Sequence, residues 1–267
     1  MPIQASMRSD PPAGPSLLER VDLALASRLV AGVGDPEPIA VAQRVLDQVR
    51  RPAPSDAVFA AGALRLRGFV VSDDDAVAAV GGGGGALSPL SQEYRLLRGL
   101  RACLDMIRGR AASGLPPDGW FATELFRTLT AELPRFRNNE LRRGPPWDAA
   151  VHVTYPQPEE LRFLLSTFDI DHHFRDLPAL WAPLHPVRQG FRLLWRFARI
   201  APFPDFNLVV AWLLANAWWQ WHGYPLLPTD GTDQLPLQRL LSGPPPTRIV
   251  PFEARLLEQL EPPARAG

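Results

Sequence analysis

Two groups of acidic and histidine side chains have residue types that can bind a metal ion. The first is the run Asp73–Asp75, and the second joins Asp171–His173 with Asp176. Helix capping explains the first group better, because Ser72 and Asp75 have the spacing of a capping box. The second group has no histidine pair at i, i+4 spacing and no third ligand at motif spacing. We therefore expect neither group to be a metal centre.

Other residues of catalytic type also have a simpler structural interpretation. Cys103 is the only cysteine, which excludes an intramolecular disulfide and a cysteine-based zinc site. It lies in an apolar helical period, so we expect an inert core thiol. His185 precedes Pro186, and we expect it to cap or pack at a helix start. The glycine run 81–85 lacks the Gly-Lys-Ser/Thr of a phosphate-binding P-loop and is typical of a flexible connector.

Helical hydrophobic periods, separated by proline and glycine clusters, account for most of the chain. They predict helices over residues 16–30, 39–51, 72–80, 90–109, 119–131, 158–169, 186–200 and 207–222. The last of these is the most apolar and is expected to be buried. Ala149–Tyr155 is the only convincing strand, and it suits one arm of a hairpin. The predicted fold is mainly α, a helical bundle around one buried central helix with a small β-hairpin flap.

The charge balance excludes a general binder of nucleic acid or of anionic membranes. The chain has 267 residues, of which 28 are acidic and 28 basic, and every basic residue is arginine. With a net charge of zero, no overall field attracts a polyanion. Four tryptophans point around all sides of one helix, which favours packing over a stacking platform for bases: Trp212, Trp218, Trp219 and Trp221.

The composition predicts a folded protein without a membrane span. Hydrophobic residues make up 46% of the chain, so its 30 prolines and 20 glycines indicate many loops and not disorder. The most apolar stretch, 208–221, contains Asn216 and Gln220 and is too short to cross a bilayer. Residues 1–15 have no basic segment followed by an apolar core, which argues against a signal peptide. We expect a soluble, cytoplasmic protein.

A more specific pattern covers residues 186–228. It begins with Pro-Val-Arg, continues with Pro-Phe-Pro-Asp-Phe-Asn at 202–207, and ends in His-Gly-Tyr-Pro at 222–225. This segment resembles the core of Fic domain proteins, the Fic/Doc or Fido fold. In that family a helix beginning His/Asp-Pro-Val leads to Ile-His-Pro-Phe-x-Asp-Gly-Asn-Gly-Arg-x-x-Arg, and a buried helix follows that Gly-Tyr-Pro-Pro closes. The two patterns align without a gap.

Several functional positions of the family motif hold other residues in this chain. The retained positions are Pro202, Phe203, Asp205 and Asn207. The replaced positions are Ala201 for the general-base histidine, Phe206 and Leu208 for the two loop glycines, and Val209 and Trp212 for the two phosphate-binding arginines. A general base contributes roughly 10²–10⁴ in rate. The glycines and arginines that would hold the nucleotide phosphates are lost as well. The resemblance therefore implies a degenerate site.

The resemblance extends upstream, so that residues from about 60 to 230 can be aligned with the family. Arg135–Asn139 looks like the family's Arg-x-Arg-Thr segment. The family's flap hairpin falls on Val151, His152, Val153 and Thr154. The stretch 63–68 is similar to the inhibitory helix Ser-x-x-x-Glu-Gly, with Ala63 at the serine and Arg67 at the glutamate. The loss of that glutamate agrees with a site that needs no inhibition.

These replacements predict a catalytically degenerate Fic protein without AMP transfer, which acts as a binding or interaction module. Its partner is expected to be a protein at the flap or a small molecule, and no cofactor is expected. One alternative is an enzyme with altered chemistry, because the replacing residues are all apolar and suit an apolar ligand pocket. The other is a residual AMP transferase, with His152 or His185 as a substitute base, ATP as substrate and magnesium held through Asp205. Otherwise Asp205 and Asn207 cap the buried helix.

The same alignment divides the chain into four parts. Residues 1–59 form an N-terminal helical extension, and 60–85 hold the degenerate inhibitory-helix-like region with its glycine-rich linker. The Fic-like core covers 86–232, and a C-terminal extension covers 233–267. Neither the partner nor the oligomeric state follows from the sequence.

Overall fold

The computed structural model describes residues 55–81, 87–137, 140–168, 186–224, 226–229 and 234–242. The described residues form helices and loops and contain no strand. The helices are α3 (Asp56–Leu66), α4 (Asp73–Gly81), α5 (Gln92–Ala112), α6 (Gly119–Leu129), α7 (Leu161–Ser166), α10 (Pro186–Ile200), α11 (Asn207–Trp221) and α12 (Gln234–Leu241), with 3-10 turns η1 (Pro134–Phe136) and η2 (Pro158–Glu160). The mainly α prediction is thus confirmed.

Some predicted features lie outside the described residues. These are the helices at 16–30 and 39–51, most of the glycine connector, the group around Asp171–Asp176, and His185. Within the described part, no cluster of three or more metal-binding side chains occurs. No helix in that part has the length and apolar character needed to cross a bilayer.

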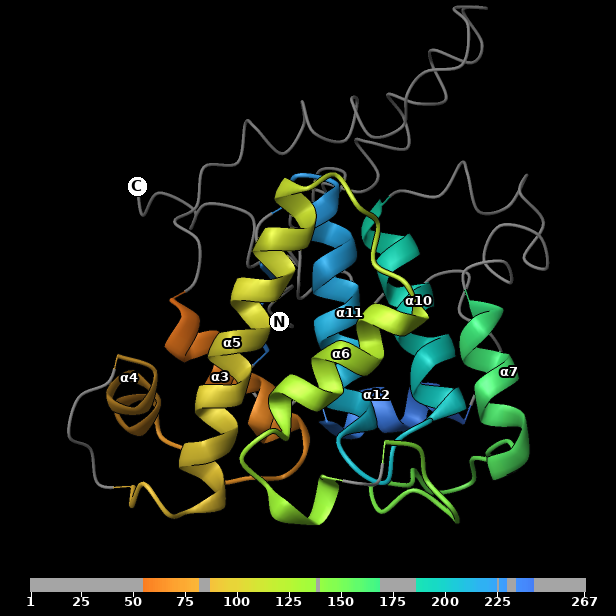
Figure 1. The fold of residues 1–267 in the computed structure, drawn as a ribbon, viewed down its shortest axis with the longest axis horizontal. Coiled ribbons are helices and arrows are strands. Elements are labelled where there is room, and N and C mark those ends of the chain that lie inside the picture. Colours follow the sequence, from red (N-terminus) through yellow and green to blue (C-terminus); the bar gives the residue numbers. More distant parts are fainter. Residues whose placement is uncertain are drawn as a thin grey trace, which may run out of the picture.

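The central element is α11, which Figure 1 shows in the middle of the molecule with α5 and α10 on either side. It packs against α10, α5, α6 and α3. Every residue from Asn207 to Trp219 is buried, which confirms the predicted central helix. Trp212 and Trp219 pack edge to face with ring centroids 5.7 Å apart, so these tryptophans serve the core.

A side-chain cap starts α4 as predicted. Ser72 Oγ accepts a hydrogen bond from the Asp75 backbone N–H at 3.1 Å and donates to the Asp75 carboxylate at 2.6 Å. The acidic run 73–75 therefore belongs to the start of α4.

Cys103 is buried in α5 and its thiol donates to the Leu125 carbonyl oxygen at 3.3 Å. Burial raises the pKa of this thiol, which keeps it unreactive.

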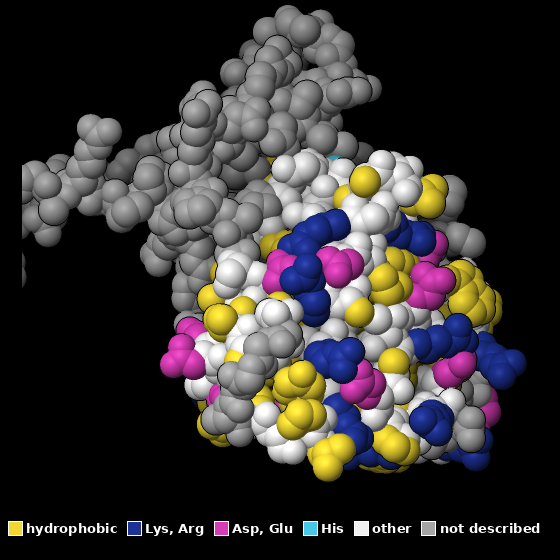
Figure 2. Space-filling view, turned by 60° about the vertical axis from the view of Figure 1, so that its left-hand side comes forward, with side chains coloured by type: hydrophobic (Ala, Val, Ile, Leu, Met, Phe, Trp, Pro, Cys, Tyr) yellow, Lys and Arg dark blue, Asp and Glu magenta, His cyan; other side chains and the backbone are white. Residues whose placement is uncertain are grey.

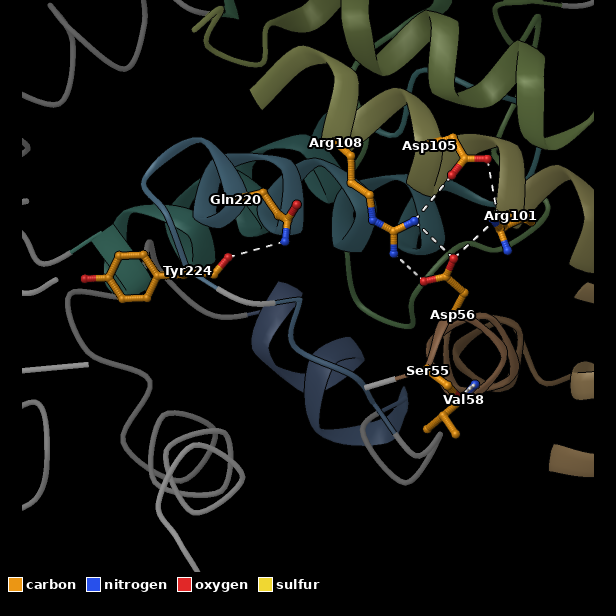
Figure 3. A network of polar contacts seen from close by, with 8 residues as sticks. All are labelled: Ser55, Asp56, Val58, Arg101, Asp105, Arg108, Gln220 and Tyr224. Atoms are coloured by element: carbon orange, nitrogen blue, oxygen red, sulfur yellow. Dashed lines mark hydrogen bonds and ion pairs between the residues drawn. The ribbon is translucent and has the colours of Figure 1, made fainter. Parts of the chain in front are cut away.

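An ion-pair network ties the start of α3 to α5 (Figure 3). Asp56 accepts two hydrogen bonds from the Arg108 guanidinium, one of them at 3.0 Å, and lies 3.4 Å from Arg101 Nε. Asp105 connects the two arginines, at 3.3 Å from each. Hydrogen bonding to Asp56 raises the pKa of Arg108. The network orients α3, whose C-terminal end reaches the site described below.

The surface of this region carries both charges. Figure 2 shows the face on which α3, α4 and α5 come forward, with arginine and acidic side chains next to one another and hydrophobic ones between them. No large area of a single charge occurs on that face. On this face, positive and negative side chains are therefore mixed, as they are in the overall composition.

The segment 149–155, predicted as a strand and as part of a flap hairpin, is not a strand in the structure. Val151 and His152 form a turn, with φ of +62° at His152, and the residues around them are irregular. No strand pairs with this segment in the described residues. Pro156 and Pro158 follow closely and cannot donate to a strand ladder. The Ala150 backbone N–H instead donates to the Tyr155 hydroxyl at 2.8 Å, which closes the segment on itself.

The crossing of α10 and α11 depends on Gly190. A Cβ atom placed on Gly190 would lie 2.1 Å from Trp219 Nε1 and 2.5 Å from Trp219 Cε2. Trp219 cannot move aside freely, because it is fully buried and packs on Phe191 with ring centroids 5.3 Å apart. The absence of a side chain at Gly190 therefore sets the distance between these two helices.

We expect Gly190→Ala to lower the free energy of unfolding by about 1–3 kcal/mol, as overpacking does in other cores. Gly109→Ala is the matched control, since Gly109 is exposed inside α5 and a Cβ there meets nothing within 4 Å. That control should raise stability by about 0.5–1 kcal/mol through helix propensity. Urea unfolding measures both. Equal effects of the two substitutions would contradict the packing argument.

A buried histidine ends α11. The His222 ring packs on Trp218 and Trp221, with centroids 4.7 and 4.6 Å away, and its Nε2 atom has no hydrogen-bond partner among the described residues. Burial lowers the pKa of His222 to about 4, because the charged imidazolium has no compensating contact. The folded protein thus keeps His222 neutral where the unfolded chain would already bind a proton.

This pKa predicts a loss of stability as pH falls. The imidazole stays neutral in the folded state down to about pH 4, whereas the unfolded chain protonates below pH 6.5. The free energy of unfolding should therefore decline by up to about 3 kcal/mol between these limits. His222→Phe should remove that part of the decline when unfolding is measured in urea from pH 7 to pH 4. Identical pH dependence in both proteins would show that His222 titrates normally.

Candidate functional site

The loop 201–206 joins α10 to α11 and is buried along its whole length. Two of its residues have left-handed backbone conformations, with φ of +42° at Ala201 and +63° at Phe206. Such a conformation costs a residue other than glycine about 1–2 kcal/mol. Phe206 stands where the resemblance predicts a glycine. The loop therefore keeps a glycine-type backbone although the residue is phenylalanine.

Aromatic packing holds this strained loop in place. The Phe206 ring is fully buried, meets the Phe136 ring edge to face at 5.8 Å and stacks on Phe69 at 6.1 Å. Phe203 stacks on Phe126 with ring centroids 4.1 Å apart. Burying one such ring contributes about 1.5–3 kcal/mol, which is enough to offset the backbone strain. The aromatic side chain fills space that a glycine loop would leave to a ligand.

The N-terminus of α11 binds a carboxylate of the chain itself. Asp148 accepts hydrogen bonds from the Asn207 backbone N–H at 2.6 Å, the Asn207 side-chain amide at 2.7 Å and the Leu208 backbone N–H at 3.4 Å. A helix N-terminus favours an anion, because its N–H groups are unpaired and its dipole is positive there. Burial raises the pKa of Asp148, the Asn207 hydrogen bonds oppose this, and the nearby Asp205 charge adds to it.

Asn207 also fastens the loop that precedes it. Its side-chain oxygen accepts from the Phe203 backbone N–H at 2.9 Å, and its amide donates to the Phe203 carbonyl oxygen at 2.9 Å. Asn207 is thus the element that joins the loop, the helix start and Asp148. The predicted capping role of Asn207 is corrected here: Phe206 stands at the N-cap of α11 without a side-chain cap, and the Asn207 side chain bonds Phe203 and Asp148 instead of the N–H groups of the helix.

Asp205 pairs with the residue that replaces the inhibitory glutamate. Arg67 Nε donates to Asp205 Oδ1 at 2.5 Å and Arg67 Nη2 donates to Oδ2 at 3.3 Å. The Asp205 side chain is only 5% exposed, whereas that of Arg67 is 29% exposed. Arg135 Nη2 lies 3.9 Å from Asp205 Oδ2, and the Phe206 backbone N–H donates to Oδ1 at 2.7 Å. A metal ion at Asp205 would have to displace the Arg67 guanidinium.

The ion pair with Asp205 favours the charged form of Arg67. Burial of Arg67 disfavours its charge, but the hydrogen bonds and the charge of Asp205 outweigh that effect and raise the pKa of Arg67. Ala63 lies one turn earlier in α3 and is fully buried in the core. Of the two predicted inhibitory-helix positions, Ala63 thus packs in the core, whereas Arg67, at the C-cap of α3, reaches the loop 201–206, which we call the motif loop.

Arg142 is a functional-site residue that the sequence analysis missed. Its guanidinium donates to the carbonyl oxygens of Ala201 at 2.6 Å, Pro156 at 2.6 Å and Gly144 at 2.9 Å. Its backbone N–H donates to the Pro202 carbonyl oxygen at 2.9 Å. Arg142 is 4% exposed, and burial lowers its pKa. It joins the motif loop to the segment expected as a flap, and no sequence motif indicates that role.

A small cavity of about 150 Å³ adjoins the motif at Ala201 and Leu208. Arg67, Asp148 and Tyr155 are among its other lining residues, so its wall is partly charged. Other apolar replacements do not face this space: Phe206, Val209 and Trp212 are fully buried in the core. The structure therefore divides the predicted degenerate pocket between a cavity wall and core packing.

Neither proposed substitute base meets this cavity in the described residues. His152 is exposed in the turn and does not line the cavity, and His185 lies outside the described residues. Of the predicted flap positions, Val151 is 73% exposed, Thr154 is exposed and Val153 is partly buried. These side chains are on the surface near the site and do not close it.

Solved structures with similar folds are Fic proteins. A Fic domain containing signaling protein from Bacteroides thetaiotaomicron aligns with a TM-score of 0.59 and 20% identity, over 90% of this chain and 93% of that one. A fragment of Fic-1 from C. elegans aligns with a TM-score of 0.58 and 14% identity, over 91% of this chain and 79% of that one. No protein-family model and no curated protein matches the sequence. The chain thus has the Fic fold.

We expect the Arg67–Asp205 pair to contribute to stability. Arg67→Met leaves the buried Asp205 carboxylate without its guanidinium, and we expect a loss of about 1–3 kcal/mol, reduced because Arg67 is partly exposed. The double variant with Asp205→Asn should recover much of this loss. Arg98→Met is the control, since its pair with Glu132 is exposed on both sides and should change stability by less than about 1 kcal/mol. Urea unfolding that finds Arg67→Met no worse than the control would contradict this role.

Proposed function

We propose that this chain is a Fic-family protein that does not transfer AMP and that acts as a binding module. The observation that carries the proposal is the Asp148 carboxylate at the N-terminus of α11. In Fic proteins this helix start follows a glycine-rich loop and presents its N–H groups to nucleotide phosphates. Here Asp148 already uses the N–H groups of Asn207 and Leu208. A phosphate would meet a carboxylate in the place where it needs donors.

The other replacements support the same proposal. Ala201 supplies no proton acceptor at the general-base position, and the described residues offer no imidazole at the cavity. Val209 and Trp212 are fully buried apolar residues where the family has phosphate-binding arginines. Asp205 is engaged by Arg67. Each loss alone would lower the rate of transfer, and together they leave neither a phosphate cradle nor a base.

The binding part of the proposal rests on the surface next to the motif. Val151, in the segment expected as a flap, is 73% exposed, and Trp147, which shortly precedes that segment, is 58% exposed. The Arg135 guanidinium lies over the Trp147 ring at 5.7 Å. Exposed aromatic and arginine side chains are typical of protein interfaces. A protein partner at this segment is therefore the proposed occupant. An enzyme with an apolar pocket has less support, because Phe206, Val209 and Trp212 are buried in the core.

The experiment compares the natural chain with Asp148→Ala in thermal unfolding, with inorganic phosphate and with ATP and magnesium. The natural chain should show no ligand-dependent rise in Tm and no transfer of labelled AMP. Asp148→Ala should be less stable by about 1–2 kcal/mol but should gain a phosphate-dependent rise in Tm, because the helix N-terminus is open.

Asp118→Ala is the matched control, since Asp118 also caps a helix, accepting from the Phe121 backbone N–H at 2.6 Å, but lies at the start of α6. It should lose similar stability and gain no phosphate response. AMP transfer by the natural chain that depends on Asp205 or Asn207 would overturn the proposal. A rise in its Tm with ATP and magnesium would do the same.

A further inference from the structure

A broad groove lies on the surface formed by α6, Arg137, the stretch 140–143 and the η2–α7 segment. Its volume is about 1090 Å³, and its wall includes Trp120, Leu141 and Phe163. We call it the arginine groove, after its lining residues Arg137, Arg142, Arg143 and Arg162. None of its lining residues belongs to the motif loop or to the small cavity at Ala201.

The arginine groove has an excess of positive charge. Arg137, Arg143 and Arg162 are exposed and have no acidic partner within the described residues. This arrangement differs from α5, where Arg98, Arg101 and Arg108 each pair with a carboxylate. The excess is therefore a local departure from the balanced charge of the chain.

The base of the groove adds to this charge. Arg142 is buried there, and within the described residues its guanidinium donates only to neutral carbonyl oxygens, among them those of Ala201 and Pro156. Of the two acidic residues in the wall, Glu140 is paired with Arg127 at 2.7 Å, which leaves Glu159. A partly buried charge acts more strongly than a fully solvated one, because the medium around it screens it less.

Two large apolar side chains stand in the same groove. Trp120 on α6 is 65% exposed and Phe163 on α7 is 58% exposed. Exposed tryptophan and phenylalanine beside unpaired arginines have the composition of a protein-interface centre, in which aromatic and arginine side chains carry most of the affinity. The groove thus offers both apolar contact and positive charge.

We propose that the arginine groove binds an acidic segment of a protein partner, with an apolar side chain of that segment packed between Trp120 and Phe163. This inference rests on the proposed binding function and names a second surface and its partner chemistry. Clustered arginines are a common means of recognising acidic motifs. A polypeptide fits better than a nucleic acid, because Glu159 lies in the wall and would repel a continuous phosphate backbone.

The test uses a library of random twelve-residue peptides displayed on phage and selected on the immobilised full chain. Selected peptides should be rich in aspartate and glutamate and contain a large apolar residue. One selected peptide, labelled with a fluorophore, is then titrated against the natural chain and the Arg143→Glu/Arg162→Glu variant. Because both reversals place like charges opposite the peptide, binding should weaken about tenfold or more.

Arg98→Glu is a charge-reversal control, since Arg98 is an exposed arginine on α5 that does not line the groove. It should leave the affinity unchanged, and circular dichroism should show the same helix content in every variant. Trp120→Ala should also weaken binding, which a purely electrostatic attraction would not require.

Three results would overturn the inference: selected peptides without an acidic bias, unchanged affinity in the double variant, or tighter binding of a single-stranded oligonucleotide than of the peptide. The nucleotide experiment above stays separate from this one. AMP transfer by the natural chain would remove the proposed function and leave the groove result standing. Failure of peptide binding would remove the groove inference and leave the nucleotide result standing.

Discussion

The structure depends on how the buried N-terminus of α11 satisfies its backbone N–H groups. This helix begins inside the protein, and its first residues are buried. Unpaired donors there would cost about 1–3 kcal/mol each. Asp148 supplies an internal carboxylate, and Asn207 ties that carboxylate to the loop before the helix. The central helix, its loop and the 140–157 segment are therefore held as one unit.

The same arrangement makes the loop before α11 and the start of that helix part of the core. A phosphate bound at a helix start serves the backbone donors only while the ligand is present, whereas an internal carboxylate serves them permanently. Phe206 fills the loop, and its ring packs against Phe69 and Phe136. Arg67 pairs with Asp205, so the retained acidic residue is also used within the chain. Side chains of the chain itself thus satisfy the helix start, fill the loop and pair with Asp205.

The arginines of this lysine-free chain have different roles at different places in the fold. Arg67 and Arg142 point inward and bind Asp205 and backbone carbonyl oxygens respectively. Those on α5 form exposed pairs with acidic neighbours, which contribute little individually. In the arginine groove, Arg137, Arg143 and Arg162 are exposed and lack acidic partners within the described residues. A chain of zero net charge therefore has a local excess of positive charge on this surface.

Hydrophobic periodicity was enough to predict most described helices, including α10 at 186–200 and the burial of α11, because a helix buried on all sides is apolar on all sides. The predicted strand at 149–155 was wrong. Its alternation suits a strand, but prolines at 156 and 158 and the left-handed His152 leave it without a partner. The helix α12 was not predicted, because its short apolar pattern includes Pro236.

The sequence by itself determined the type of fold and the residues that stand at the positions of the Fic motif in the alignment, since both depend on local order along the chain. Only the tertiary structure decided what those residues contact. Asp148 lies 59 residues before Asn207, and Arg67 lies 138 residues before Asp205, so neither pair has a sequence spacing that could reveal it. Contacts of this kind form only after packing brings distant segments together, and they decide whether the helix N-terminus is open to a ligand.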